Sequence, residues 1–467
     1  MLKPLLLSEV STALAGHLLN ADATFKGVSI DSRAITKGQL FIALTGPRFD
    51  GHDYLNEVAA KGAVAALVER EVPESALPQL IVKDTRVALG QLGALNRAGY
   101  DKPVGALNRA GYDKPVAAIT GSSGKTTVKE MLACILRTRG PVLATKGNLN
   151  NDLGVPLTLM ELAPEHTAAV IELGASRLGE IAYTVGLTRP HVAVLNNAGT
   201  AHVGEFGGPE KIVEAKGEII EGLAADGVAV LNLDDKAFGI WKARAGERKV
   251  LTFALSNVQA DFHASQLTRD ARGCPGFMLH SPAGVEHVQL NLLGSHNVAN
   301  ALAAAAAAHA LGVSLFGIVS GLNAVQPVKG RAVAQLTPSG LRIIDDTYNA
   351  NPTSMCAAVD ILAAFSGRTV LVLGDIGELG EWAEQGHREV GAYAADKVSA
   401  LYAVGPMMAH AVAAFGHQAR HFANQADLIK ALRAEHETNT TILIKGSRSA
   451  AMENVVAALC GSSGEKH

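Results

Sequence analysis

The sequence predicts an α/β protein built from three consecutive domains, and three observations carry this prediction. Residues 116–119 have the pattern of a buried strand, and a glycine-rich turn joins them to a helical pattern that begins near Lys125. Strand patterns then alternate with helical patterns to about residue 323, as in a parallel sheet. More strand patterns, separated by helical ones, follow Pro327 at 341–344, 369–373, 400–404 and 441–445.

The first 84 residues form the smallest domain, in which short strands alternate with helices around a polar, glycine-rich patch at 30–52. Proline and glycine residues place the other boundary near residue 325. We therefore expect a small N-terminal α/β domain at 1–84, a central domain with a parallel sheet at 85–325, and a C-terminal Rossmann-like α/β domain at 326–467. Within the central domain, residues 249–292 have a mostly extended pattern.

The composition indicates a globular enzyme, because 48% of the 467 residues are apolar and 18% are charged. The net charge of −3 gives no basic surface, so we expect no nucleic-acid partner. No apolar run is long enough to predict a membrane span, and the apolar start of the chain is too short for a signal peptide. The 4 cysteines are far apart, which favours a reducing compartment. We therefore expect a cytoplasmic protein, and we expect it to be a monomer.

One segment occurs twice in tandem, because GALNRAGYDKPV stands at 93–104 and again at 105–116. Each copy ends a helical pattern with Gly-Tyr-Asp-Lys-Pro, so the pair predicts an inserted surface loop. The identity of the two copies indicates a recent duplication or an error of sequence assembly. We assign the repeat no function.

The glycine-rich turn has the composition of a phosphate-binding loop. Gly121 and Gly124 allow backbone N–H groups to converge on phosphate oxygens, and the N-terminus of the next helix favours the same anion. Lys125 can reach the β- and γ-phosphates of a nucleoside triphosphate, and the Thr126 hydroxyl can bind Mg²⁺. Ile119 stands where the common GxxxxGK[ST] pattern has a glycine, so an ordinary turn before a helix is the alternative. The predicted nucleotide site comprises Gly121, Ser122, Ser123, Gly124, Lys125, Thr126 and Thr127.

Two polar side chains follow later strands of the same sheet. Glu172 lies near the end of the strand at 168–173, where a carboxylate is a natural Mg²⁺ ligand, because ligands bind beyond the carboxyl ends of parallel strands. His202 follows the strand at 191–195 in a glycine-rich loop, which suggests backbone wrapped around a ligand. The alternatives are a capping or solvated glutamate and an ordinary loop histidine.

Lys216 falls on the apolar face of a helix predicted at 209–223. A buried, unpaired ammonium is costly, so this lysine must extend to solvent, pair with a carboxylate, bind phosphate or be modified. We favour a position close to the metal.

Further polar groups come from an alanine-rich helix and from the C-terminal domain. Asn297 and Asn300 share one helix face and can hydrogen-bond to the edge of a heterocycle, unless they only cap the helix. Polar loops follow the strands at 341–344, 369–373 and 441–445. Because polar ends of several strands form one rim, we expect a binding site there.

Together these motifs resemble the Mur ligase family, whose members are ATP-dependent amide-forming enzymes of peptidoglycan synthesis. The resemblance covers essentially the whole chain. It rests on TGSSGKTT (120–127), KGNLNNDLGVP (146–156), ELGAS (172–176), NNAGTAHVGEFGG (196–208), EAKGEI (214–219), GSHNVANALAA (294–304), DDTYNANP (345–352), LGDIGELG (373–380) and KGSRSAAME (445–453). Family members that add diaminopimelate or lysine carry Asp-Asn-Pro-Arg in the third domain, where this chain has Asn-Ala-Asn-Pro at 349–352. The loop therefore favours the members that add D-alanyl-D-alanine to a UDP-N-acetylmuramoyl tripeptide through an acyl phosphate.

The resemblance implies an N-terminal uridine-nucleotide domain, a central ATPase domain and a C-terminal ligase domain. It also implies ATP and two Mg²⁺ ions as cofactors. The implied catalytic groups are Lys125, Glu172, His202, Lys216 and Arg331, and the implied metal site comprises Thr126, Glu172, His202 and Lys216, with Lys216 carbamylated as in several members. Asn297, Asn300, Asp346 and Arg331 would contact the adenine, ribose and γ-phosphate of ATP. The small-molecule substrates would meet Ser32, Arg33, Gly46, Arg48, Asp50, His52, Asn150, Asn151, Tyr348, Asn349, Asn351 and Arg448.

Two rival interpretations remain open. The nearer one is another amide ligase of the superfamily, either the diaminopimelate- or lysine-adding enzyme or a folylpolyglutamate synthase. The other is a binding module that closes around a nucleotide without forming a bond. The second rival needs only the phosphate loop and leaves Glu172, His202 and Lys216 unexplained.

Overall fold

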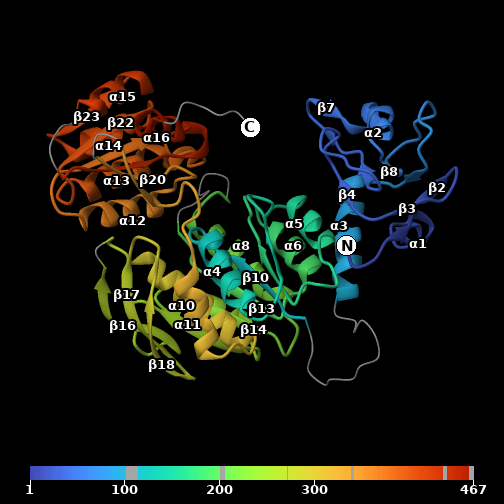
Figure 1. Cartoon of the computed structure of the whole chain (residues 1–467), viewed down its shortest axis with the longest axis horizontal. Helices are drawn as coiled ribbons and strands as arrows, with labels where there is room; N and C mark the ends of the chain where they lie inside the picture. Colours follow the sequence, from blue (N-terminus) through green and yellow to red (C-terminus); the bar gives the residue numbers. More distant parts are fainter. Residues whose placement is uncertain (101–113, 200–205, 271, 338–340, 435–438, 462–467) are drawn as a thin grey trace.

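The structure is a computed structural model that describes the chain except residues 101–113, 200–205, 271, 338–340, 435–438 and 462–467. Three α/β domains follow one another along the chain, and the central domain lies between the other two (Figure 1). The three-domain α/β prediction is therefore confirmed. In the part of the chain that the structure describes, no helix has the length and apolar character needed to cross a membrane.

The N-terminal domain is built on one small sheet with the strand order β2-β9-β8-β5-β4. Its strands are parallel except for β2, which pairs antiparallel with β9. Its elements are β1 (Leu5–Leu6), α1 (Leu7–Ser11), β2 (His17–Leu19), β3 (Thr24–Phe25), β4 (Val28–Ser29), β5 (Leu40–Ile42), β6 (Thr45–Gly46), β7 (Phe49–Asp50), α2 (Leu55–Ala60), β8 (Ala65–Val68) and β9 (Gln79–Ile81).

Helix α3 (Thr85–Tyr100) connects the N-terminal domain to the central one. Its Leu89 and Leu92 belong to the N-terminal core. Further along the same helix, Arg97 is fully buried and donates hydrogen bonds to the carbonyls of Thr188 and Arg189 in the central domain. The helix thus contacts both domains. The boundary between the N-terminal and central domains at residue 84 stays a prediction. Most of the repeat unit that follows lies outside the described residues.

The central domain contains one large sheet with the order β11-β12-β10-β13-β14-β15-β16-β17-β18. The strands from β11 to β16 run parallel, and β16, β17 and β18 form antiparallel pairs, as the extended pattern at 249–292 predicted in outline. The strands are β10 (Val116–Thr120), β11 (Val142–Ala144), β12 (Ala168–Glu172), β13 (Val192–Leu195), β14 (Val228–Asn232), β15 (Lys249–Ala254), β16 (Phe262–Arg269), β17 (Pro275–Ser281) and β18 (Gly284–Gln289). The helices are α4 (Lys125–Arg137), α5 (Gly154–Met160), α6 (Glu180–Thr188), α8 (Pro209–Gly217), α9 (Phe238–Ala245), α10 (His296–Ala310) and α11 (Leu315–Ala324).

Both faces of this sheet are covered, which explains why β10 is apolar along its whole length. Ala117 and Ile119 face a core shared with α4 and α10. Val116 and Ala118 face the opposite core with α5 and α6. Successive side chains of β10 therefore enter two different cores, and helices cover both faces of the strand.

The C-terminal domain has a sheet with the order β19-β20-β24-β21-β22-β23, in which only the pair of β19 and β20 is antiparallel among the described strands. Its strands are β19 (Val333–Leu336), β20 (Arg342–Asp346), β21 (Thr369–Gly374), β22 (Ala400–Val404), β23 (Ala419–Phe422) and β24 (Thr441–Lys445). Its helices are α12 (Pro352–Ala363), α13 (Ala383–Ala394), α14 (Met408–Phe415), α15 (Gln425–Arg433) and α16 (Glu453–Cys460). Because β20, β24 and β21 are parallel neighbours, their polar loops lie at one edge of the sheet, as predicted.

Candidate active site

The phosphate-binding loop lies between the end of β10 and the start of α4. Gly124 has a φ of 80°, and a Cβ there would lie 2.5 Å from Asn196 Nδ2 and in contact with Asn300 Oδ1, so only glycine fits. Asn196 and Asn197 hold the loop in place. The backbone N–H of Ser123 donates to Asn197 Oδ1 at 2.9 Å, and Asn196 Nδ2 donates to the Ser123 carbonyl at 2.9 Å.

Lys125, Thr126, Glu172 and Arg331 meet at the mouth of this loop. The Thr126 hydroxyl donates to Glu172 Oε2 at 2.9 Å and accepts from Arg331 Nη2 at 2.9 Å. Lys125 Nζ donates to the Gly121 carbonyl at 2.7 Å. Burial lowers the pKa of Lys125, nearby Glu172 opposes this shift, and the charge of Arg331 adds to it. Cationic side chains of two domains thus meet at this loop.

The Thr126 hydroxyl and the buried Glu172 carboxylate form the kind of oxygen site that suits Mg²⁺. Asn150 Nδ2 donates to the other carboxylate oxygen, Glu172 Oε1, at 2.9 Å and orients it. Within the described ranges, no three histidine, cysteine, aspartate or glutamate side chains form a complete metal site. These residues therefore fit an ion that takes its remaining ligands from phosphate and water. His202, the other predicted ligand, lies outside the described residues.

Lys216 is buried in α8, as its place on the apolar helix face predicted. The prediction of one continuous helix over 209–223 was wrong at its C-terminal end. Helix α8 ends at Gly217, and a 3₁₀ turn covers Glu218–Gly222. The Lys216 Nζ lies 5.3 Å from the centre of the Phe206 ring. Burial lowers the pKa of Lys216 to about 7, with a further contribution from Lys125, although Glu180 and Glu218 oppose the shift. Its surroundings thus favour the neutral amine over the ammonium, relative to an ordinary lysine.

A cavity of about 210 Å³ opens beside the loop, between the central and C-terminal domains. Asn297 and Asn300 line it from α10 and are joined by a hydrogen bond of 2.9 Å. Asp346 lines it from β20 and accepts from Lys445 Nζ at 2.7 Å. The Arg331 guanidinium lies 4.3 Å from the centre of the Tyr348 ring. The structure thus gathers the predicted nucleotide residues of two domains around one cleft.

Family models match all three domains of this chain. The Mur ligase family catalytic domain matches residues 24–97, the Mur ligase middle domain matches 119–308, and the Mur ligase glutamate ligase domain matches 330–448. The chain belongs to the Mur ligase family. It is therefore a ligase, and the resemblance seen in its motifs is confirmed.

Relatives match this Mur ligase over nearly its full length. The UDP-N-acetylmuramoyl-tripeptide–D-alanyl-D-alanine ligase of Escherichia coli (strain K12) is 46% identical over 97% of this chain and 98% of its own length. A crystal structure of MurF from Acinetobacter baumannii has a TM-score of 0.91 and 40% identity, and covers 99% of this chain and 100% of that one. A MurF ligase from Thermotoga maritima in complex with ADP has a TM-score of 0.82 and 27% identity, and covers 93% and 97% of the two chains. The ADP complex agrees with nucleotide binding by this Mur ligase.

The predicted uridine-binding residues lie in the N-terminal domain, in the turn at 32–33, on the short hairpin of β6 and β7 and in the 3₁₀ turn after it. Arg33 is exposed and pairs with Asp31 at 2.8 Å, and this hydrogen-bonded contact lowers the pKa of Asp31 to about 2. Asp50 pairs with Arg70 at 2.7 Å and contacts His52 Nδ1 at 2.6 Å. The His52 ring is buried and its Nε2 accepts from the Glu69 backbone N–H at 2.9 Å, so both ring nitrogens hold the loop together. The remaining predicted members, Ser32 and Gly46, are half-buried, whereas Arg48 is exposed.

The predicted peptide-binding residues come from one loop of the central domain and from the rim of the C-terminal domain. Asn151 Oδ1 accepts from the Gly154 N–H at 2.8 Å, so this side chain helps to start α5. Asn351 caps α12 and its Nδ2 lies 3.3 Å from Ser123 Oγ, which joins the third domain to the phosphate loop. Asn349 is exposed, and Arg448 pairs with Glu453 at 3.0 Å. Their contact with a substrate stays a prediction.

Several residues of the site were not singled out from the sequence. Asn196 and Asn197 follow β13 directly, so the rule that identified Glu172 after β12 could have found them. Lys445 ends β24 and is buried against Asp346, and His296 opens α10 in the same cleft. Lys129 is buried one turn after Lys125, and its Nζ forms an ion pair of 2.6 Å with Glu130.

We expect Lys129 to help position the Glu172 carboxylate. Its Nζ donates to the Thr145 carbonyl at 2.6 Å, and the Thr145 hydroxyl accepts from the Glu172 backbone N–H at 2.9 Å. Replacement of Lys129 by methionine is expected to leave the Thr145 carbonyl unsatisfied and to displace Glu172 slightly. We expect kcat to fall roughly 10- to 100-fold, because small misplacements of reacting groups are costly.

Steady-state kinetics at several Mg²⁺ concentrations test this prediction. We expect the Lys129→Met variant to need more Mg²⁺, with a smaller change in the KM for the amine substrate. The matched control is Lys236→Met, at an exposed lysine of the same domain. Wild-type kinetics in the Lys129 variant would contradict the positioning role.

Proposed function

We propose that this chain is an ATP-dependent amide ligase that adds D-alanyl-D-alanine to UDP-N-acetylmuramoyl tripeptide in the cytoplasm. The contact between Arg331 and Thr126 carries this proposal, because it brings a third-domain cation to the phosphate loop beside Lys125 and Glu172. We assign these substrates because they are the ones named for the Escherichia coli relative, which is 46% identical to this chain. We expect the ligase to act as a monomer.

The proposed reaction proceeds through an acyl phosphate. A carboxylate oxygen of the tripeptide attacks the γ-phosphorus of ATP, and the bond to the β-phosphate oxygen breaks, which releases ADP. The amine of D-alanyl-D-alanine then attacks the acyl carbon. Inorganic phosphate leaves and the amine loses a proton, so one amide bond forms for each ATP.

Lys125 and Arg331 lower the electrostatic cost of the first step. A carboxylate that approaches a phosphate brings two anions together, and fixed cations stabilise the charge that accumulates between them. Both side chains are held in place before the substrate arrives, Lys125 by the Gly121 carbonyl and Arg331 by Thr126. An acyl phosphate hydrolyses if water reaches it, so we expect the C-terminal domain to close over the site during turnover.

Thr126 and Glu172 would hold one Mg²⁺, and we place a second near His202 and Lys216. Bound Mg²⁺ supplies further neutralisation of the phosphate oxygens. The low pKa of Lys216, about 7, favours reaction of its neutral amine with carbon dioxide. We propose that the resulting carbamate gives the buried side chain a negative charge near the second metal.

The other predicted contacts complete the proposal. Asn297 and Asn300 would face adenine, and Asp346 would face the ribose. Ser32, Arg33 and the loop at 46–52 would hold the uridine diphosphate. Asn150 and Asn151 would meet the muramoyl peptide. Tyr348, Asn349, Asn351 and Arg448 would select the incoming dipeptide.

Phosphate release from ATP tests both the reaction and the substrates. We expect release only when UDP-N-acetylmuramoyl tripeptide and D-alanyl-D-alanine are both present, with a pentapeptide product by mass. Controls supply free D-glutamate or diaminopimelate with the matching shorter precursors. Release with diaminopimelate and the dipeptide precursor would keep the mechanism but replace the substrates. Tight ADP binding without phosphate release in any mixture would favour the nucleotide-gated binding module.

A further inference from the structure

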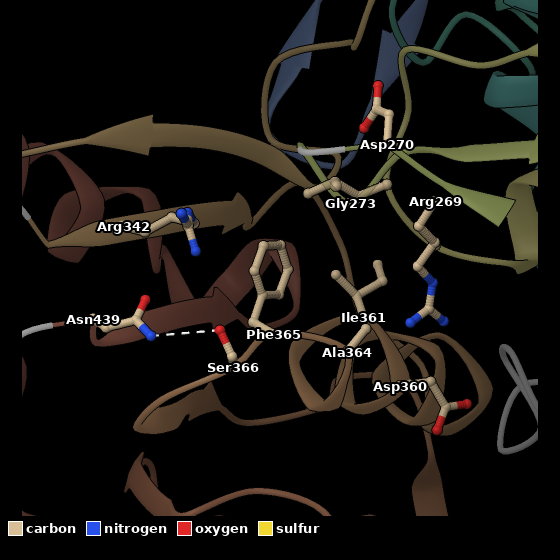
Figure 2. Close-up of a pocket in the computed structure, with 12 residues that line it drawn as sticks. Arg269, Asp270, Gly273, Arg342, Asp360, Ile361, Ala364, Phe365, Ser366 and Asn439 are labelled. Carbon is tan, nitrogen blue, oxygen red and sulfur yellow. Dashed lines mark hydrogen bonds between the residues drawn. The ribbon is translucent and has the colours of Figure 1, made fainter.

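A second cavity, of about 250 Å³, lies between the central and C-terminal domains outside the nucleotide cleft. The central domain contributes Arg269, at the end of β16, and the segment before α10. The C-terminal domain contributes Arg342, on β20, and the second half of α12 (Figure 2). None of the proposed substrate contacts lies in this cavity.

The two arginines of this cavity form no ion pair with a carboxylate of the described residues, although Asp270 and Asp360 line the same cavity. Among the described residues, neither guanidinium lies within 4.0 Å of a carboxylate oxygen. Arg342 lies over the Phe365 ring at 5.1 Å, and its Nη1 makes a long hydrogen bond of 3.3 Å to Thr441 Oγ1. Most of its N–H donors therefore remain available to a ligand.

The two carboxylates that line the cavity are already paired with other cations. Asp270 forms an ion pair of 2.6 Å with Arg272, whose hydrogen bonds help to lower the pKa of Asp270. Asp360 forms an ion pair of 2.9 Å with Lys397 and accepts from the Tyr393 hydroxyl at 2.9 Å. The charges of the lining residues alone balance, but with Arg272 and Lys397, which lie outside the lining, the surroundings of the cavity carry a net positive charge.

Neutral donors accompany the arginines on the C-terminal side of the cavity. Asn439 Nδ2 lies 3.4 Å from Ser366 Oγ, which leaves the Ser366 O–H free to donate to a ligand (Figure 2). The volume is below the range of roughly 300–1,000 Å³ that is usual for larger organic ligands. Its size, charge and donors together fit a small anion with more than one charged group.

The same two elements wall this cavity and the nucleotide cleft. On the central side, Gly294 lines the second cavity and His296, two residues later, lines the cleft. On α12, Ile361 lines the second cavity and Ala358 lines the cleft. A Cβ on Gly294 would lie 2.8 Å from Ile361 Cγ1, so the two walls are in close contact.

We propose that this cavity is a regulatory site for a small multivalent anion that carries phosphate or carboxylate groups. An anion bound to both Arg269 and Arg342 ties the C-terminal domain to the central one. It favours the arrangement in which Arg331 reaches Thr126, and it therefore raises the affinity of the neighbouring cleft for nucleotide. The proposal goes beyond the ligase reaction and does not depend on which amino acid is added.

Calorimetric titration of the ADP-saturated full chain tests the site, because ADP occupies the phosphate loop. Pyrophosphate and citrate serve as separate probes, at constant ionic strength and without Mg²⁺, which both would chelate. We expect one of them to bind wild-type protein at a single site. We expect binding at least about tenfold weaker in the double variant Arg269→Gln/Arg342→Gln, because hydrogen bonds to charged groups are lost. Binding of only one probe distinguishes phosphate from carboxylate ligands.

The control Arg139→Gln/Arg420→Gln removes the same charge from exposed positions of the same two domains, away from the cavity. It should bind the probe as the wild type does. The probe should also raise the affinity of wild-type protein for ADP by about fivefold or more, and this effect should vanish in the cavity variant. If the double variant unfolds, the single change of the exposed Arg269 gives the same comparison. Equal binding by all variants, or no binding by the wild type, would overturn the proposal.

Discussion

Replacement of Lys125 by alanine is expected to abolish ATP turnover while the protein stays folded. The Lys125 ammonium lies at the start of α4, beside Thr126 and Arg331, where the γ-phosphate would gain charge during transfer. A fixed cation at that position contributes to the transition state more than to the bound ground state. We expect kcat to fall about a thousandfold or more.

The fold should tolerate this change, because the Lys125 side chain makes one hydrogen bond among the described residues, to the Gly121 carbonyl. Burial already disfavours its charged form. Thermal unfolding should therefore show a melting temperature close to that of the wild type. The control is Lys242→Ala, at an exposed lysine of the central domain, which should keep full turnover. Normal phosphate release by Lys125→Ala would falsify the assignment of the phosphate loop.

Replacement of Lys216 by alanine should leave the enzyme nearly inactive. If the carbamate of Lys216 supports a metal, its removal should cost about 100-fold in activity, as for other groups that orient a metal site. Short carboxylic acids such as formate and acetate should restore part of the activity, because they can place a carboxylate in the space that the side chain leaves.

The pH dependence provides a second measure of the role of Lys216. Its folded-state pKa of about 7 lies below that of an ordinary lysine, so the neutral amine, which reacts with carbon dioxide, increases as the pH rises through 7. Added bicarbonate should therefore stimulate wild-type enzyme prepared free of carbon dioxide, and more strongly above pH 7 than below. Carbon-13 NMR with labelled carbon dioxide should detect the carbamate in the wild type and not in Lys216→Ala. A variant that carboxylic acids do not rescue would indicate that the ammonium itself acts.

Local patterns were sufficient to predict much of the fold and part of the site. The run from β10 through Gly121 and Gly124 to Lys125 is continuous in sequence, so its strand, turn and helix could be recognised without knowledge of the rest of the molecule. Lys216 could be placed in the interior because helical periodicity assigns it to the apolar face. The end of the helix at Gly217 could not be placed, because a 3₁₀ turn continues the same pattern.

The strand order of the central sheet lay beyond such patterns. β10 has β12 on one side and β13 on the other, and this order brings Glu172 and Asn196 next to the phosphate loop. Hydrophobic periodicity shows which face of a strand is buried, but it carries no information about which strands are neighbours. The position of Asn196 and Asn197 after a strand could have marked them as site residues, but their contact with a loop more than 70 residues earlier in the chain could not be predicted from periodicity.

The sequence by itself determined the three α/β domains, the phosphate-binding loop and the buried lysine, because each of these depends on residues close together in the chain. Tertiary structure alone decided that Arg331 reaches Thr126 across 205 residues and that Asn351 contacts Ser123 across 228. It also decided that Arg269 and Arg342, which form no ion pair with a described carboxylate, line one cavity between domains. Such contacts arise from the packing of one folded domain on another, and that packing depends on the shapes and charges of whole surfaces rather than on the spacing of residues along the chain.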